Sequence, residues 1–135
     1  VISNRNQHRN PSVGASSTVQ VLRMPSSYSG TSRLLPGAAT ATEVMVLLEK
    51  GFIIQKFFPA EPAGGTAYLS SLASPLPQVS FCPTGGITPE KAVSYLKLAN
   101  VITVGGSWMA PKSLVAAKDW AGIEKLAAEA AKLKG

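Results

Sequence analysis

The stretch VSFCPTGGITPEKAVSYL (residues 79–96) holds a short apolar run, a Gly-Gly pair and a longer segment that starts with Thr88-Pro89. Threonine is a preferred helix N-cap, and proline is favoured at the first helical position because its missing N–H costs no hydrogen bond there. We therefore predict a strand over residues 79–83 that runs through the Gly-Gly turn into a helix starting at Pro89.

The same order of strand, turn and helix recurs on both sides of this stretch. Upstream, strands are predicted over residues 34–38 and 52–58. Thr40 and Glu43 form a capping box for the helix between them. Downstream, a strand is predicted over residues 101–104.

The chain ends in a helix that Asp119 is expected to cap. The apolar stripe of this helix comprises Ile123, Leu126, Ala127, Ala130 and Leu133. Strands that alternate with helices in this way are typical of a parallel sheet covered by helices. The pattern predicts an α/β fold and leaves open whether it is half of a (β/α)8 barrel or a small doubly wound sheet.

The first 33 residues differ in character from residues 34–135. They contain eight serines and no sustained helical or strand period, so we expect an irregular or disordered segment. It could be an organellar transit peptide, a genuine tail, or a stretch foreign to the domain from a fragmentary coding sequence. A chain that begins at Val1 favours the last of these.

The positive charge of the chain is concentrated in that segment. All four arginines lie there without an acid, whereas residues 34–135 hold nine lysines and seven acids, a net +2 of the total +6. This balance argues against a nucleic-acid partner. No apolar run is long enough for a transmembrane helix, so no membrane association is expected. We expect a cytoplasmic protein, or an organellar one if the leader is a transit peptide.

Cysteine and histidine are too few to build a metal site. The single cysteine, Cys82, lies in an apolar strand where we expect it to be buried, and the single histidine, His8, lies in the first segment. Neither a zinc site nor a Cys-His catalytic pair is therefore predicted. Trp108 and Trp120 are expected to be packing anchors.

Lys56 stands out in the predicted strand IIQKFF (residues 53–58). The two-residue period of a strand places Ile54, Lys56 and Phe58 on one face, which is buried or lines a barrel interior. Desolvation favours the neutral amine, which can attack a carbonyl group. The residues also allow a strand-end lysine that reaches solvent or pairs with Glu61.

Two Gly-Gly turns follow consecutive predicted strands, at Gly85-Gly86 and at Gly105-Gly106. Glycines let backbone N–H groups approach an anion, and a helix N-terminus adds a favourable dipole. In (β/α)8 barrels, phosphate commonly binds at the loops after the last two strands. The two turns are equally compatible with phosphate binding and with ordinary tight turns.

Four linked motifs over about residues 34–135 resemble the family of 2-keto-3-deoxy-6-phosphogluconate (KDPG) aldolases, also called 4-hydroxy-2-oxoglutarate (KHG) aldolases. The motifs are Leu35-Pro36-Gly37 with Thr40 and Glu43, Lys56-Phe57-Phe58-Pro59-Ala60-Glu61 with Gly64-Gly65, Phe81-Cys82-Pro83-Thr84-Gly85-Gly86-Ile87, and Val104-Gly105-Gly106-Ser107-Trp108. Their order and spacing both match the family.

The resemblance implies a trimeric (β/α)8 barrel that cleaves KDPG to pyruvate and glyceraldehyde 3-phosphate, and KHG to pyruvate and glyoxylate. Neither a metal nor an external cofactor is implied, because Lys56 would form an imine with the C2 ketone. Phe58 would lie beside the bound pyruvate and Thr84 near the reacting carbons. The residues expected to hold the substrate phosphate are Gly85, Gly86, Gly106 and Ser107.

The chain departs from the family in its first part. The family carries its acid/base glutamate and a carboxylate-binding arginine on the second barrel strand, and nothing in residues 1–33 resembles that strand. We therefore expect a partial barrel of about the last four βα units, incomplete, inactive and poorly soluble alone. The alternatives are a non-catalytic half barrel that binds sugar phosphate or a partner half, and another phosphate-binding barrel enzyme, such as an isomerase, in which Lys56 is incidental.

Overall fold

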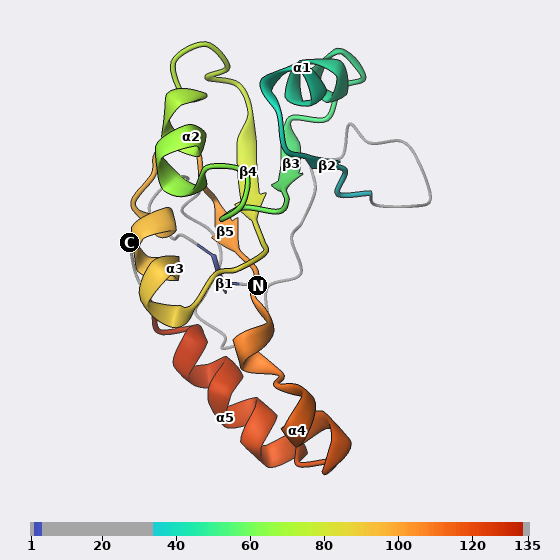
Figure 1. Ribbon diagram of the computed structural model, residues 1–135, viewed down its shortest axis with the longest axis vertical. Helices are drawn as coiled ribbons and strands as arrows, with labels where there is room; N and C mark the ends of the chain where they lie inside the picture. Colours follow the sequence, from blue (N-terminus) through green and yellow to red (C-terminus); the bar gives the residue numbers. More distant parts are fainter. Residues whose placement is uncertain (1, 4–33, 134–135) are drawn as a thin grey trace, which may run out of the picture.

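The computed structural model describes residues 2–3 and 34–133, and its centre is a parallel sheet (Figure 1). Strands β2 (Gly37–Ala38), β3 (Ile54–Phe57) and β4 (Ser80–Pro83) pair in that order. Strand β5 (Thr103–Val104) lies beyond β4, and a parallel bridge between Phe81 and Val101 joins its segment to the sheet. The predicted α/β arrangement of parallel strands is confirmed.

A short strand from the beginning of the chain adds to the far side of β5. Strand β1 (Ile2–Ser3) runs antiparallel to β5, with Ile2 opposite Val104 and Ser3 opposite Thr103. No strand was expected in this segment, because two residues are too few to show a period. The rest of residues 1–33, with His8, lies outside the described residues. The expectation of an irregular segment concerns these residues and stays a prediction.

Three helices alternate with the strands, and two of them begin as predicted. Helix α1 (Ala41–Glu49) follows the capping box, in which Glu43 N–H donates to Thr40 Oγ1 and Thr40 N–H donates to the Glu43 carboxylate. Helix α2 (Gly65–Ser71) follows Gly64. Helix α3 (Pro89–Leu96) is capped by the Thr88 hydroxyl, which accepts from Lys91 N–H.

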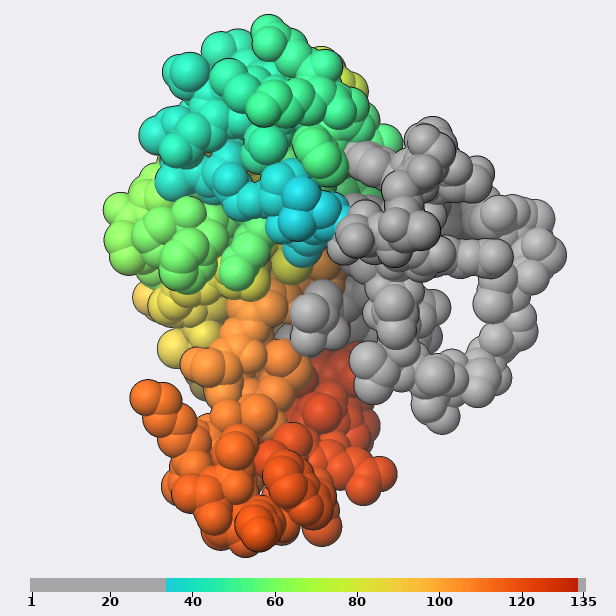
Figure 2. Space-filling model, turned by 90° about the vertical axis from the view of Figure 1, so that its right-hand side faces the viewer, coloured from blue at the N-terminus to red at the C-terminus, as the bar shows by residue number. Residues whose placement is uncertain are grey.

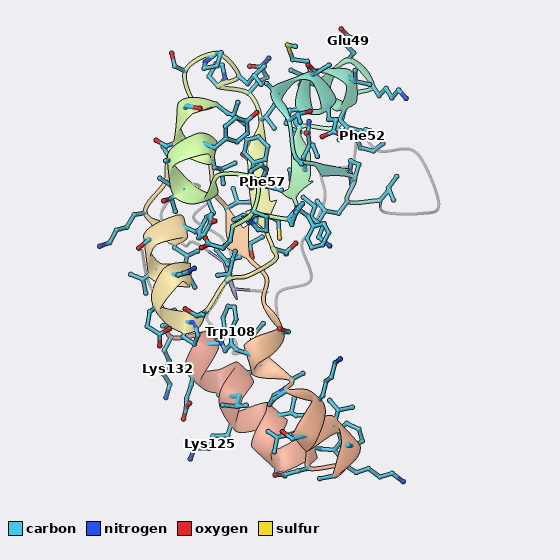
Figure 3. All side chains as sticks on the ribbon, in the orientation of Figure 1. Glu49, Phe52, Phe57, Trp108, Lys125 and Lys132 are labelled. Carbon is cyan, nitrogen blue, oxygen red and sulfur yellow. The ribbon has the colours of Figure 1, made fainter. Side chains whose placement is uncertain are left out.

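The core lies between the sheet and these helices. The Phe57 ring on β3 (Figure 3) stacks on Tyr68 of α2 at 5.9 Å between centroids and meets Phe81 of β4 edge-on. Gln55, also fully buried, donates from Nε2 to the carbonyl groups of Val44 and Phe52. Gln55 and Phe57 therefore point to the helices. Because side chains alternate along a strand, Lys56 points to the opposite face of the sheet.

The C-terminal elements form a separate arm. A 3-10 turn, η1 (Ser107–Met109), leads to α4 (Lys112–Ala116) and α5 (Trp120–Ala130), which lie at the end of the molecule opposite α1 (Figures 1 and 2). Asp119 caps α5 as predicted, accepting from Gly122 N–H at 2.9 Å.

One expectation about packing in this arm is wrong. Trp120 is 63% exposed, because it is the first residue of α5 at the tip of the arm, so it is no packing anchor. Of the predicted α5 stripe, Ala130 is buried and the remainder is only partly covered. Trp108, in contrast, packs against the core.

Candidate active site

A cavity of about 500 Å³ opens at the carboxyl ends of β3 and β4, beside the turn that follows β5. It is lined by Lys56, Phe58, Thr84, Gly85, Gly86, Ile87, Gly105, Gly106 and Ser107. All seven residues expected to react with or bind substrate are in this lining. The two-residue period of the strand could place only Lys56 and Phe58 on the same face. The parallel sheet brings the turns after β3, β4 and β5 to the same edge.

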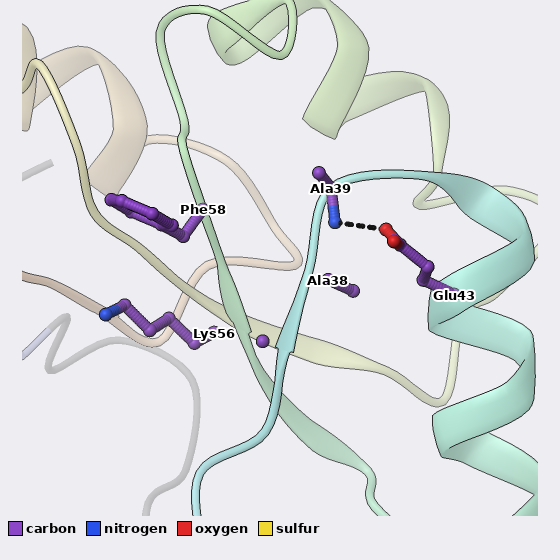
Figure 4. Close-up of a pocket in the computed structure, with 6 residues that line it drawn as sticks. Ala38, Ala39, Glu43, Lys56 and Phe58 are labelled. Atoms are coloured by element: carbon purple, nitrogen blue, oxygen red, sulfur yellow. Dashed lines mark hydrogen bonds between the residues drawn. The ribbon is translucent and has the colours of Figure 1, made fainter.

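Lys56 reaches into this cavity from the middle of the sheet. It lies opposite Gly37 on β2 and Cys82 on β4, and its Nζ is 4.8 Å from the Phe58 ring centroid, a cation–π contact (Figure 4). Its face is the wall of an open cavity rather than a closed core, since Phe58 is 52% exposed. The ammonium group forms no ion pair within residues 34–133, and the alternative pairing with Glu61 is wrong because Glu61 binds other groups.

A smaller cavity of about 350 Å³ adjoins the first and shares Lys56 and Phe58 with it. Among the described residues that line the two cavities, Glu43 is the one carboxylate. Its Oε2 accepts from Ala39 N–H at 2.8 Å (Figure 4) and from Thr40 at the cap of α1. These bonds, the one from Ala39 foremost, hold the pKa of Glu43 below its usual value, so this carboxylate is a poor proton donor at neutral pH.

The Thr84 hydroxyl is a buried polar group without a partner among the described residues. Its Oγ1 makes no hydrogen bond within residues 34–133, although Thr84 N–H donates to Phe57 O at 2.9 Å and Thr84 O accepts from Ala60 N–H at 2.8 Å. Buried hydroxyl groups are nearly always hydrogen-bonded, so one left free beside a cavity is available to a ligand. The sequence named Thr84 but could not show that its hydroxyl is unpaired.

The Gly85-Gly86 turn has a backbone that only glycine adopts without strain. Its φ angles are +99° and +76°, in the left-handed region. A Cβ added to Gly86 would lie 2.9 Å from Glu61 Cβ, and one added to Gly85 would lie 3.1 Å from the Phe58 ring. The lack of side chains lets Glu61 and Phe58 pack closely against this turn, which lines the cavity.

The second turn depends on glycine for another reason. Gly106 has an extended backbone, but the Trp108 ring lies directly on it, so that an added Cβ would be 1.7 Å from Trp108 Cζ3 (Figure 3). The indole ring therefore packs against the turn that carries Ser107 and leaves no room for a side chain at Gly106.

A polar network behind the first turn was not found from the sequence. The Glu61 carboxylate accepts from Tyr95 OH at 2.7 Å and pairs with the Lys91 ammonium group; both partners are on α3. Lys91 and, to a smaller extent, Tyr95 lower the pKa of Glu61. Burial, followed by the neighbouring carboxylate, raises the pKa of Tyr95. These contacts join residues 30 and 34 positions apart, so no local pattern reveals them.

We expect this network to lose its stabilising effect in acid. A carboxyl group whose pKa is lowered by folding stabilises the protein above its unfolded pKa, usually 4.5 for Glu61, and the effect is lost as pH falls through the folded pKa. Thermal unfolding of the native chain and of Glu61→Gln should therefore differ most near pH 7 and converge well below pH 4.5. A difference that stays constant from pH 7 down to about pH 3 would contradict this.

Cys82 is buried, as expected, with 2% of its surface exposed. Burial raises the pKa of its thiol, which the charge of Lys56 offsets in part, so the thiol is protonated and inert at neutral pH. Within the described residues, no three His, Cys, Asp or Glu side chains gather in a way that could hold a metal ion. Over the same residues, none of the helices has the length and apolar character needed to cross a membrane.

Comparison with known proteins points to one family. The family model for KDPG and KHG aldolases matches residues 18–126. The 2-dehydro-3-deoxy-phosphogluconate aldolase of Pseudomonas aeruginosa is 46% identical over 97 residues, which are 72% of this chain and 44% of that protein. The enzyme of the same name from Zymomonas mobilis is 50% identical over 101 residues, 75% of this chain and 47% of that one.

Solved structures agree with the sequence comparison. KDPG aldolase from Legionella pneumophila, captured with pyruvate as a covalent carbinolamine, superposes with a TM-score of 0.71 at 38% identity, over 79% of this chain and 50% of that one. The Zymomonas mobilis aldolase with 3-phosphoglycerate gives 0.68 at 50% identity, over 74% and 46%. The chain thus spans about half the length of the curated relatives it matches.

Proposed function

Because the chain belongs to the KDPG and KHG aldolase family, we propose that it is the lysine-bearing part of a class I aldolase that cleaves KDPG and also KHG. One observation carries the proposal: Lys56 shares a cavity with the unpaired Thr84 hydroxyl and with both Gly-Gly turns. The covalent carbinolamine of pyruvate in the related Legionella enzyme supports an amine nucleophile here.

The chemistry assigned to Lys56 needs no external cofactor. The neutral amine adds to the C2 ketone, and loss of water gives a protonated imine. When the C3–C4 bond breaks, its electron pair moves toward the imine nitrogen and leaves an enamine. The aldehyde product departs, the enamine takes a proton at C3, and water hydrolyses the imine to release pyruvate and the free lysine.

The other walls of the cavity match the parts of such a substrate. Phe58 provides an apolar surface 4.8 Å from Lys56 Nζ, next to which a pyruvyl group would bind. The Thr84 hydroxyl, free of partners in the described part, would hydrogen-bond near the reacting carbons. Gly85 and Gly86, with Gly106 and Ser107 on the second turn, would hold the phosphate group.

One step of the reaction needs a group that these walls do not provide. Cleavage requires a base for the proton of the C4 hydroxyl, and the one carboxylate in the lining, Glu43, is committed to the α1 cap. We infer that this polypeptide alone forms the imine but cleaves substrate about 10² to 10⁴ times more slowly than a chain with a positioned acid/base. A partial (β/α)8 barrel of about the last four βα units, a homotrimeric assembly and a cytoplasmic location belong to the same proposal.

Reductive trapping with pyruvate tests the proposal. The chain is incubated with pyruvate and sodium borohydride, digested, and the modified peptide is identified by mass spectrometry. We expect a stable adduct on Lys56, and none with lactate, which has the same carbon skeleton but no ketone. If no adduct forms while phosphate still binds, the chain is instead a non-catalytic half barrel for sugar phosphates.

A further inference from the structure

Glu61 connects the Gly85-Gly86 turn to helix α3, although it does not line the cavity. Its backbone N–H donates to Gly85 O at 3.2 Å, which links the loop after β3 to the turn after β4. Its carboxylate accepts from Tyr95 OH at 2.7 Å and pairs with Lys91, both on the helix that the turn leads into. The turn is thus held on both of its sides by one residue.

The stem of the same side chain supports the turn from behind. A Cβ on Gly86 would lie 2.9 Å from Glu61 Cβ and 3.0 Å from Cγ, so the two residues are in close van der Waals contact. The anchor at the other end of the side chain is rigid, because Tyr95 is fully buried. The bonds of the carboxylate thus hold in place the Glu61 stem against which the Gly86 backbone packs.

Glu61 also lies close along the chain to the reacting lysine. Lys56 is on β3, and the loop after β3 reaches Glu61 five residues later. The distance between the Lys56 amine and the Gly85-Gly86 turn therefore depends on where the Glu61 carboxylate is bound on α3. A phosphorylated keto acid must span that distance, so its binding depends on the bonds that the Glu61 carboxylate makes to α3.

The charge of Glu61 by itself would weaken phosphate binding at the Gly85-Gly86 turn. A carboxylate near an anion-binding turn repels phosphate, and pairing with Lys91 offsets that repulsion. The favourable contacts of Glu61 are the bonds of its carboxylate to Tyr95 and Lys91 and of its N–H to Gly85 O. We propose that Glu61 is the positioning residue of the phosphate turn; this rests on the proposed function, in which Gly85 and Gly86 hold the phosphate of the substrate.

The test measures inorganic phosphate binding to the full chain, by titration of the Gly85 and Gly86 amide resonances in ¹H–¹⁵N spectra. We compare the native chain with Glu61→Gln and with the control Glu49→Gln, an exposed position at the end of α1 (Figure 3) that removes the same charge. We expect Glu61→Gln to weaken phosphate binding about tenfold and the control to change it less than about twofold. Unchanged or tighter binding by Glu61→Gln, the result that charge alone predicts, would overturn the inference.

Two further measurements separate the possible failures. Tyr95→Phe keeps the ion pair but removes the 2.7 Å hydrogen bond, and is expected to weaken phosphate binding about threefold even if Glu61→Gln does not fold. In Glu61→Gln, the loss in phosphate affinity should exceed any loss in pyruvate trapping at Lys56. A native chain that traps no pyruvate contradicts the proposed function, whereas trapping and phosphate binding that are both unaffected in Glu61→Gln contradict this inference alone.

Discussion

Replacing Lys56 by arginine is expected to abolish the reductive trapping of pyruvate. Arginine preserves the positive charge that Lys56 places over the Phe58 ring, but its guanidinium group stays protonated and cannot add to a ketone. The adduct should fall to the background seen without pyruvate, a loss of at least about 100-fold. Circular dichroism and thermal unfolding should be nearly unchanged, because Lys56 makes no ion pair within the described residues.

The matched control for this prediction is Lys97→Arg. Lys97 is an exposed lysine at the end of α3, away from the cavity lining. Its variant should trap pyruvate as well as the native chain does. If Lys56→Arg instead keeps its adduct, with the label on another lysine, then the amine of Lys56 is not the nucleophile and the assignment of the cavity is wrong.

Gly106→Ala is expected to cause the second large effect, on the other side of the cavity. Its methyl group would lie 1.7 Å from Trp108 Cζ3 and 2.0 Å from Cε3, so the ring must leave its site against the core. Overpacking of this kind costs about 1 to 3 kcal/mol of folding free energy. We expect a loss near the upper end of that range and at least tenfold weaker phosphate binding, because the ring packs against the turn that holds Ser107.

Removing the ring provides the control for this clash. In the Trp108→Ala background, the step from Gly106 to Ala should cost less than about 1 kcal/mol, since the atoms that the methyl group meets are gone. Tryptophan fluorescence follows the ring directly, because Trp120 is 63% exposed and its emission should not respond. If the Gly106→Ala chain unfolds at the same temperature as the native chain and its tryptophan fluorescence is unchanged, the turn tolerates a side chain and the prediction is wrong.

Local signals in the sequence predicted most of the secondary structure. Capping by Thr40, Thr88 and Asp119 depends on residues three positions away, so these helix starts could be read directly. The strands were predicted too long: residues 34–38 contain a two-residue strand, because pairing partners decide where a ladder ends. Helix α4, with five residues, was missed because it is shorter than two turns of an apolar period.

The amino-acid sequence by itself determined the alternation of strands and helices, the face that Lys56 shares with Phe58, and the residues of both Gly-Gly turns. Each of these depends on spacing along the chain, which is visible without a fold. Only the tertiary structure decided that all seven site residues border one cavity, that the Thr84 hydroxyl has no partner in the described part of the chain, and that Glu61 binds Lys91 and Tyr95 rather than Lys56. These features depend on contacts between distant segments, which exist only once parallel strands place their ends side by side.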